Sequence, residues 1–571
     1  MDSIKKQIAD VLSEQIEGLD VSEIEALIEI PANSEMGDYA FPCFKLAKSM
    51  HKAPNLIAAE IAEKISSSSL FDKVESVNAY VNMFMKKGDF ARTTLEAVFA
   101  NPEKYGSSNQ GENKKVIVEY SSPNIAKPFH IGHIRTTVIG NAIANIYDFL
   151  GYDVVRINHL GDYGTQFGKM IVAFRHWGKK EDVESDPIKT LLSYYIKFHE
   201  EAEKDPTLDE EARKAFAALE HGDEEETKLW QWIRDESLKE FTRVYDMLGI
   251  SFDSYAGEAF YSDKMPAVIE ELKDKGLLKD SQGAQIVELE PYGISAPAII
   301  TKSDGTSIYL TRDLAAALYR KNTYDFDKCI YVVASQQDLH FQQLFKVLEL
   351  MGYAWAKDMI HVNFGMVSLD SGTLSTRKGN VVFLEDVLNK AVEKTKEIIT
   401  EKGVNTDNLD EISKVVGIGA VIFKELSAGR IKDYVFDWDK VLNFDGETGP
   451  YVQYTHARAS SVIRNSGIDC TKIDPETIDY SVLSSDSATE LIKEIYAFPA
   501  AVDKAAKDYE PSIVTRSIIN IAECFNKFYH DEHIITDNEE EKKARVMLTY
   551  ATTIVLKNGL NLLGMVAPER M

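Results

Sequence analysis

The sequence predicts an α/β protein with a doubly wound parallel sheet in the middle of the chain, a small α+β domain before it and an all-α bundle after it. A β-branched run, "VIVEY" (116–120), precedes a long apolar-periodic helix and a second strand, "YDVVRINHL" (152–160). This β-α-β unit is the starting element of a parallel sheet. From about residue 410 onward, apolar residues recur at spacings of three and four, which is typical of packed helices.

The first domain is expected over residues 1–110. Amphipathic helical patterns begin and end it, and "NAYVNMFMKK" (78–87) alternates like a half-buried strand. A polar linker rich in Gly and Asn, "NPEKYGSSNQGENKK" (101–115), follows and marks a boundary.

The middle domain is expected over residues 111–440 and the helical domain over 441–571. Gly151 is predicted to be the C-cap of the helix after "VIVEY". At about 175–300, acidic helices and hairpin-type strands with an Asp-Gly turn interrupt the sheet. The strand–helix alternation resumes with "KCIYVVAS" (328–335).

The bulk composition predicts a multidomain cytoplasmic protein. The chain has 571 residues, more than one core usually holds. It contains no apolar run of about 18 residues, so no membrane association is expected. Four widely separated cysteines form no zinc-binding spacing, so no tightly bound structural metal is expected. The formal net charge of −27 argues against a nucleic-acid partner, although a local basic face can persist on an acidic protein.

The stretch "SPNIAKPFHIGHIRTTVIGNAI" (122–143) carries the strongest chemical signal. It places His130 and His133 in a loop and first helical turn after a strand, where ligands bind in such sheets. A helix N-terminus suits phosphate, and imidazoles can donate hydrogen bonds to phosphate oxygens. The alternatives are a metal site with His159 as a third ligand, or surface histidines without a role.

The longer stretch "EYSSPNIAKPFHIGHIRTTVIGNAI" (119–143) resembles the HIGH signature of class I aminoacyl-tRNA synthetases, in the form found in arginyl-tRNA synthetases. Further stretches resemble that family in the same order along essentially the whole chain. They are "GDYAFPCFKLAK", "NHLGDYGTQFG", "YLTRDLAAALYR", "YVVASQQDLHFQQ", "LSTRKGNVVFLEDVL", "FDGETGPYVQYTHAR" and the terminal "GMVAPERM". The resemblance implies a Rossmann-type catalytic domain, a tRNA-contacting N-terminal domain and an anticodon-binding bundle.

The resemblance also implies the reaction: L-arginine and ATP form arginyl-adenylate, and arginine is transferred to the 3′-terminal adenosine of tRNA(Arg). A carboxylate is the natural receiver of a guanidinium. The residues assigned to arginine are Glu119, Ser121, Asn124, His133, Tyr309, Asp313 and Gln337. Two alternatives stay open, because Asp313 could be a helix N-cap and Gln337 could cap the next helix.

The ATP site departs from the class pattern in one place. The second signature loop usually supplies a lysine, but in "TLSTR" (373–377) Thr376 stands at that position. We hypothesise that Lys127 supplies the missing charge, with help from Arg377 and Lys378. Together with His130 and His133 these residues would bind ATP, which enters with Mg²⁺.

The tRNA partner is assigned to aromatic and terminal residues by the same resemblance. Tyr451, Tyr454, Tyr529 and Met571 would shape the anticodon-loop site, and Asn82 and Phe84 would contact the tRNA elbow. Aromatics on a helical stripe are more often core residues, and that alternative stays open. A nucleotidyl transferase without tRNA and an inactive tRNA-binding paralogue are the rival functions, and a monomer is expected.

Overall fold

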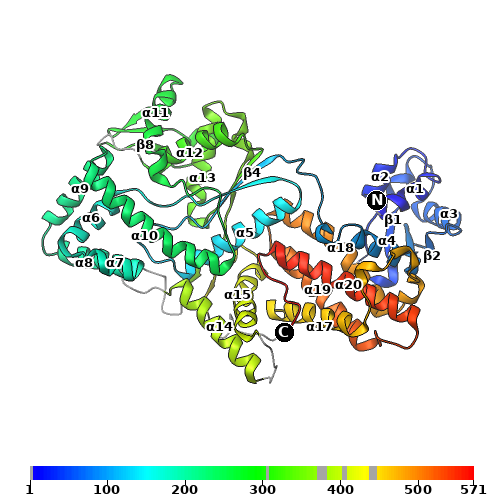
Figure 1. The fold of residues 1–571 in the computed structure, drawn as a ribbon. Helices are drawn as coiled ribbons and strands as arrows, with labels where there is room; N and C mark the ends of the chain where they lie inside the picture. Colours follow the sequence, from blue (N-terminus) through cyan, green and yellow to red (C-terminus); the bar gives the residue numbers. More distant parts are fainter. Residues whose placement is uncertain are drawn as a thin grey trace. The chain divides into compact units, whose positions relative to one another are not determined.

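The structure is a computed structural model that describes residues 4–31, 33–303, 308–368, 382–401, 408–435, 437 and 446–571. The chain divides into two compact units, each built from separate segments (Figure 1). The first comprises Met1–Tyr105, Arg458–Ala497 and Asn520–Val555. The second comprises Gly106–Ala457, Phe498–Ile519 and Leu556–Met571.

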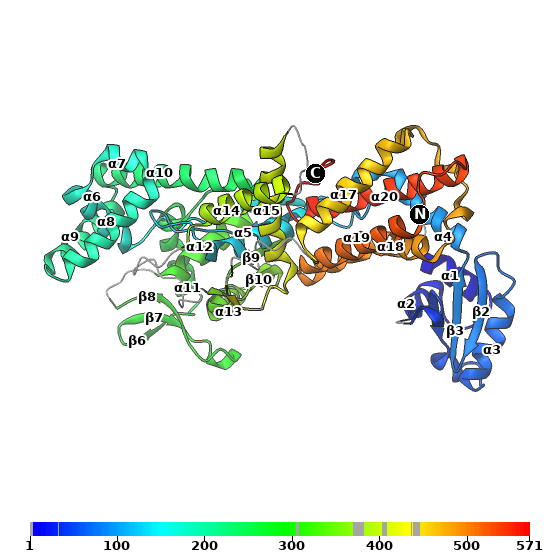
Figure 2. The ribbon, with the colours of Figure 1, turned by 90° about the horizontal axis from the view of Figure 1, so that it is seen from below.

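The N-terminal part of the first unit is a small α+β structure. Its antiparallel sheet has the order β1-β3-β2, with strands Tyr39–Pro42, Tyr80–Met85 and Phe71–Val77. Figure 2 shows this sheet in blue with its helices, which are α1 (Ile4–Ser13), α2 (Val21–Leu27), α3 (Pro54–Ile65) and α4 (Lys87–Ala100). Asp20 and Glu23 form a reciprocal capping box that starts α2.

The C-terminal part of the chain is helical. The helices are α17 (Gly449–Ser466), α18 (Asp486–Asp508), α19 (Ser512–Asp531) and α20 (Glu539–Leu562). Their apolar faces are buried, as at Leu491, Ile495 and Phe525. Together with the small α+β structure and the parallel sheet, they confirm the predicted fold class. The three domain bounds, 1–110, 111–440 and 441–571, stay a prediction.

The centre of the second unit is a four-stranded parallel sheet with the order β10-β9-β4-β5. Its strands are β4 (Lys115–Glu119), β5 (Asp153–Ile157), β9 (Lys328–Val332) and β10 (Met359–Val362). The chain runs from β4 outward to β5 and later returns to β9 on the other side of β4. The carboxyl ends of β4 and β9 therefore form a switch point, where ligands bind in doubly wound sheets.

The helix that joins β4 to β5 is α5 (Ile134–Phe149), labelled beside β4 in Figure 1. It is buried along most of its length, as expected for a helix that is apolar all round. Leu150 occupies the cap position, and Gly151 follows with φ +85°. The prediction of Gly151 as the cap is off by one residue, since glycine commonly takes the left-handed position just after the cap.

Between β5 and β9 the chain adds helices and a small antiparallel sheet of β6 (Lys279–Ser281), β7 (Ala284–Val287) and β8 (Ala298–Thr301), green in Figure 2. The helices are α6 (Thr165–Trp177), α7 (Lys180–Ser185), α8 (Pro187–Ala202), α9 (Thr207–Glu220), α10 (Glu224–Leu248), α11 (Met265–Asp274) and α12 (Tyr309–Tyr324). The predicted Asp-Gly turn lies outside the described residues. Within those residues, no helix combines the length and apolar character that crossing a bilayer needs.

After β9 the second unit adds α13 (Asp338–Leu350), α14 (Leu384–Glu401) and α15 (Leu409–Ser427). Two short parallel strands, β11 (Val367–Ser368) and β12 (Tyr434–Val435), pair with each other.

Candidate active site

The two signature histidines lie at the N-terminus of α5, and each ring accepts a hydrogen bond from a backbone N–H of the turn that carries them. The backbone N–H of His130 donates to Nδ1 of His133 at 3.1 Å, and the N–H of Gly132 donates to Nδ1 of His130 at 3.1 Å. The ring centroids lie 4.0 Å apart. The pair thus closes the short 3₁₀ turn Ile131–His133 in the manner of a capping box.

Both imidazoles are neutral at physiological pH. Burial lowers the pKa of His130 to about 4, and the charge of Lys127 acts in the same direction. Burial also holds the pKa of His133 well below its ordinary value. A neutral imidazole has one acceptor and one donor nitrogen. Because each Nδ1 accepts a backbone hydrogen bond, each Nε2 carries the proton and is the donor available to a ligand.

His159, the third ligand in the metal-site alternative, makes its contacts with other residues. This side chain stacks on Tyr261, its Nδ1 lies 3.3 Å from Nη2 of Arg320, and its Nε2 lies 3.8 Å from Oδ1 of Asp313. Among the described residues, no group of three His, Cys, Asp or Glu side chains is arranged to hold a metal ion.

The loop between β4 and the histidines is conformationally strained. Ser121, Ser122 and Ala126 have φ of 70°, 45° and 58°, in the left-handed region that is unfavourable for residues other than glycine. Such residues cluster at functional sites. The Ser121 hydroxyl is buried and bonds to the hydroxyls of Thr137 and Tyr245, at 2.9 and 2.7 Å. These bonds anchor Ser121 to α5 and α10, while a contact of Ser121 with arginine stays a prediction.

Asn124 lies against Gly161, from the segment after β5. The two residues form an isolated parallel bridge, and the N–H of Gly161 donates to the carbonyl of Pro123 at 3.1 Å. A Cβ at position 161 would lie 2.4 Å from Oδ1 of Asn124. Only glycine therefore leaves the Asn124 side chain in its place.

Asp313 lies in the second turn of α12, so it is not the N-cap residue of that helix. Its Oδ2 lies 2.6 Å from Nε2 of His340. Burial by itself raises the pKa of Asp313, but the hydrogen bond and charge of His340 outweigh it and lower the pKa overall. Gln337 is exposed and stands before α13, where its side chain makes no capping hydrogen bond.

Glu119, the last residue of β4, is already paired inside the protein. Its Oε2 lies 2.6 Å from Nη2 of Arg320, and both side chains are buried. The sequence does not indicate this pairing, because the partners are about two hundred residues apart in a chain without repeats.

Glu258 is a further carboxylate that sequence reasoning missed. Burial raises its pKa to about 8; Arg312, at 3.0 Å, opposes this shift, and Asp313 and Asp162 contribute to it. Tyr309 is 60% exposed, and its ring lies 5.7 Å from the Arg312 guanidinium carbon. Glu258 lies in no recognisable motif, so no sequence signal points to it.

Lys127 lies close enough to affect the charge state of three of these groups. Its positive charge lowers the pKa values of His130, His133 and Glu258. Thr376, Arg377 and Lys378 lie outside the described residues.

The tRNA candidates differ in accessibility. In the second unit, Tyr454 on α17 is 47% exposed and Tyr451 is half-buried, as is the terminal Met571. In the first unit, Tyr529 is 44% exposed, Phe84 is half-buried, and Asn82 is buried in the middle strand β3. The core-packing alternative is therefore wrong for the two exposed tyrosines, and the buried Asn82 offers no accessible side chain.

Arg458 is a second residue that sequence reasoning missed. Its guanidinium carbon lies 5.4 Å from the ring centre of Tyr529, and its Nη1 donates to Oδ1 of Asn526 at 2.7 Å. Its spacing of four from Tyr454 on a helix is the signal that could have found it.

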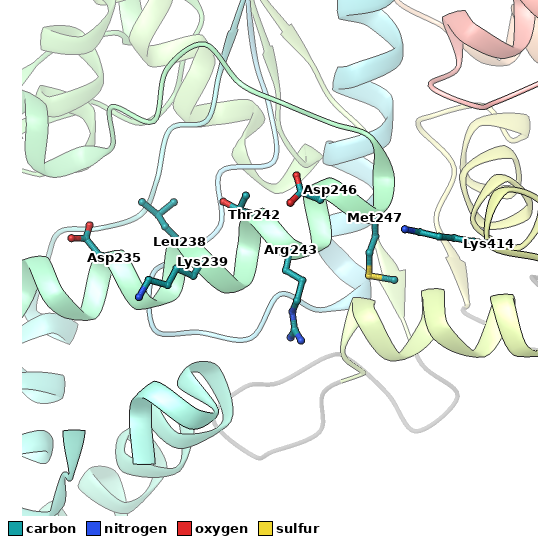
Figure 3. A pocket seen from close by; sticks show the side chains of 8 residues that line it. All are labelled: Asp235, Leu238, Lys239, Thr242, Arg243, Asp246, Met247 and Lys414. Atoms are coloured by element: carbon teal, nitrogen blue, oxygen red, sulfur yellow. The ribbon is translucent and has the colours of Figure 1, made fainter. Parts of the chain in front are cut away.

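A separate groove of about 630 Å³ runs along α10. Figure 3 shows side chains of α10 along it, with Lys414 of α15 at one end. It shares no residue with the cluster around His130, Asn124 and Asp313, so we do not assign the chemistry to it.

Comparisons with known proteins identify the family of the chain. The family model described as "tRNA synthetases class I (R), catalytic domain" matches residues 94–438. The descriptions "Arginyl tRNA synthetase N terminal domain" and "DALR anticodon binding domain" match residues 2–85 and 452–571. The chain belongs to the arginyl-tRNA synthetase family.

Members of the arginyl-tRNA synthetase family match the whole chain. The proteins named arginine–tRNA ligase from Clostridioides difficile (strain 630) and Halothermothrix orenii are 61% and 60% identical to it, each over 100% of both chains. The crystal structure of arginyl-tRNA synthetase from Plasmodium falciparum is 25% identical, covers 100% of both chains and superposes with a TM-score of 0.81.

Proposed function

We propose that this protein is an arginine–tRNA ligase. It activates L-arginine with ATP to arginyl-adenylate and transfers arginine to the 3′-terminal adenosine of tRNA(Arg) in protein synthesis. The carrying observation is the pair of backbone-bonded histidines at the switch point of the sheet, since it leaves two neutral Nε2–H donors at a helix N-terminus. The relatives' shared name supports the substrates.

Catalysis in this proposal is positioning and charge stabilisation. The arginine carboxylate is already a nucleophile, so no general base is needed for activation. His130 and His133 donate from Nε2 to phosphate oxygens as charge builds on them in the transition state. Neutral imidazoles suit this role, because a donor with a pKa of about 4 keeps the same protonation state across the physiological range.

Arginine is held at its two ends. Asp313 and Tyr309 receive the guanidinium, and we add Glu258 because its carboxylate is electrostatically coupled to Asp313. Asn124 and Gln337 hold the α-amino and carboxylate groups, with His133 near the carboxylate. Ser121 and Glu119 complete the pocket: Ser121 holds the loop, and Glu119 holds Arg320.

ATP brings Mg²⁺ with it as part of the substrate. Lys127, Arg377 and Lys378 are proposed to neutralise its phosphates together. The influence of Lys127 on both histidines supports its place at this site.

The tRNA is proposed to contact the terminal domains, over 1–110 and 441–571, while 111–440 catalyses. Tyr451, Tyr454, Tyr529 and Met571 are each proposed to contact the anticodon loop, and we add Arg458 to these residues. Phe84 lies on the elbow side, and Asn82 supports its strand. The protein acts as a cytoplasmic monomer in this proposal.

The test is a charging assay with ATP, each amino acid in turn, and total tRNA. Charging with arginine alone is the expected result. Charging with another amino acid would refute the assignment, and activation without transfer would favour the nucleotidyl transferase. No activation together with tRNA binding would favour the inactive paralogue.

A further inference from the structure

Arg135 joins three segments of the second unit at one buried point. It lies two residues after His133 and is wholly buried. Its Nη1 donates to the carbonyl of Gly365 at 2.8 Å and to the carbonyl of Lys432 at 2.7 Å. A Cβ at position 365 would lie 2.5 Å from the carbonyl carbon of Lys432, so the two backbones touch there.

Glu425 and Tyr434 hold the guanidinium from its other side. Oε2 of Glu425, on α15, lies 3.6 Å from Nε of Arg135, and both side chains are buried. The Tyr434 hydroxyl donates to Glu425, and the Tyr434 ring centre lies 5.5 Å from the guanidinium carbon. A buried guanidinium is tolerated when a counter-ion and hydrogen-bond acceptors lie around it, and Glu425 and the two carbonyls take these places.

The segments that the Arg135 cluster joins are close in the chain to residues that contact the histidine turn. Gly365 and Met366 precede β11, whose last residue, Ser368, is the last described residue before 369–381. On the far side of that segment, Phe383 forms an antiparallel bridge with His130, and the N–H of Ile131 donates to the carbonyl of Val382 at 2.9 Å. One flank is therefore fixed to the histidine turn by backbone bonds, and the other by the Arg135 side chain.

We propose that Arg135 is a positioning residue for arginine activation: it fixes β11 and the 430–435 segment against the turn that carries His130 and His133. The inference rests on the proposed function. The phosphate donors must hold their geometry to a fraction of an ångström, since a displacement of about 1 Å can cost about 10²-fold in rate. Arg135 itself is buried and touches no substrate.

The first test is the double variant Arg135→Met/Glu425→Gln, which removes both charges together. Replacing a buried pair by groups of similar volume is often tolerated, whereas removing one partner is not. ATP–pyrophosphate exchange is measured with arginine and total tRNA present. We expect kcat to fall about 10- to 100-fold, with the KM for arginine unchanged.

Tyr434→Phe keeps the ring and removes only the hydroxyl that orients Glu425, so it tests the same point if the double variant does not fold. We expect a smaller loss of kcat, again at constant KM for arginine. Its matched control is Tyr480→Phe, which removes a hydroxyl that donates to the carbonyl of Pro475 at 3.1 Å in the first unit. That control is expected to match the wild type.

Three outcomes decide the matter. A selective loss of kcat in either folded variant supports the positioning role. Wild-type kcat in the folded variants, or a loss that only tracks the unfolded fraction, overturns it. A wild-type protein that activates no arginine would instead refute the proposed function itself.

Discussion

Nη2 of Arg320 lies 2.6 Å from Oε2 of Glu119. The carboxylate that the sequence analysis assigns to the arginine pocket is therefore already paired with a guanidinium of the protein itself. Glu119→Gln should leave Arg320 buried without its counter-ion and destabilise the second unit by about 3–5 kcal/mol. Urea unfolding followed by fluorescence measures this loss. Glu349→Gln, at the exposed pair with Lys346, should cost less than about 1 kcal/mol. A stable Glu119→Gln protein with a raised KM for arginine would mean that Glu119 serves the substrate instead.

The depressed pKa of His130 predicts a pH-dependent stability. An unfolded histidine binds a proton below its ordinary pKa of about 6.5. In the folded protein, His130 stays neutral until the pH falls to about 4. The unfolded state therefore binds more protons in this window, and stability falls as the pH drops from 6.5 toward 4. His130→Asn should flatten the slope of the urea midpoint against pH in that range. Equal slopes of the urea midpoint against pH for His130→Asn and the wild type would contradict the lowered pKa of His130.

Lys127 should be essential for activation if it replaces the missing signature-loop cation. Lys127→Ala is expected to lower kcat for ATP–pyrophosphate exchange about 10²- to 10³-fold, as for loss of one preorganised transition-state contact. Lys214→Ala, at an exposed pair with Glu210 on α9, is the control and should retain full activity. Near-normal turnover of Lys127→Ala would end the hypothesis.

Gly161→Ala should impair arginine binding without touching the substrate. The added methyl group would lie 2.4 Å from Oδ1 of Asn124 and must displace that side chain. Loss of a hydrogen bond to a charged group costs about 1.5–3 kcal/mol, so the KM for arginine should rise about 10- to 100-fold. Gly429→Ala, where an added Cβ meets no atom within 4 Å, should be neutral. Equal KM values for both variants would remove Asn124 from the pocket.

The exposed side chain of Tyr454 should contribute to tRNA affinity and not to the stability of the fold. Stacking of a base on an aromatic ring contributes about 1–3 kcal/mol, so Tyr454→Ala should weaken tRNA binding about 5- to 100-fold at fixed salt. Tyr292→Ala, at a tyrosine that is 52% exposed in the insertion, should leave the dissociation constant unchanged. If both variants bind tRNA like the wild type, the anticodon site lies elsewhere.

The fold could be predicted from the sequence wherever local pattern and tertiary packing agree. The run "VIVEY" became β4 except for Tyr120, because its β-branched side chains are buried in a parallel sheet. The end of α5 was misplaced by one residue, since Gly151 follows the cap position and does not occupy it.

The candidate site was predictable where its residues form short motifs. His130, His133 and Asn124 are close in sequence and are brought to one end of β4. Glu258 and Arg320 reach their partners across long stretches of chain, and a sequence pattern carries no sign of such contacts. Asp313 was ambiguous because "TRD" resembles a helix start, but α12 begins four residues earlier, at Tyr309.

The strained loop has a consequence for anyone who wishes to make this protein more heat-resistant. Replacing Ser122 or Ala126 by glycine would relieve an unfavourable backbone conformation, which can raise the melting temperature. In this loop the same change would also make the backbone between β4 and the histidine pair more flexible. Thermal tolerance gained there would be obtained at the expense of turnover, so stabilising substitutions belong on distant surfaces.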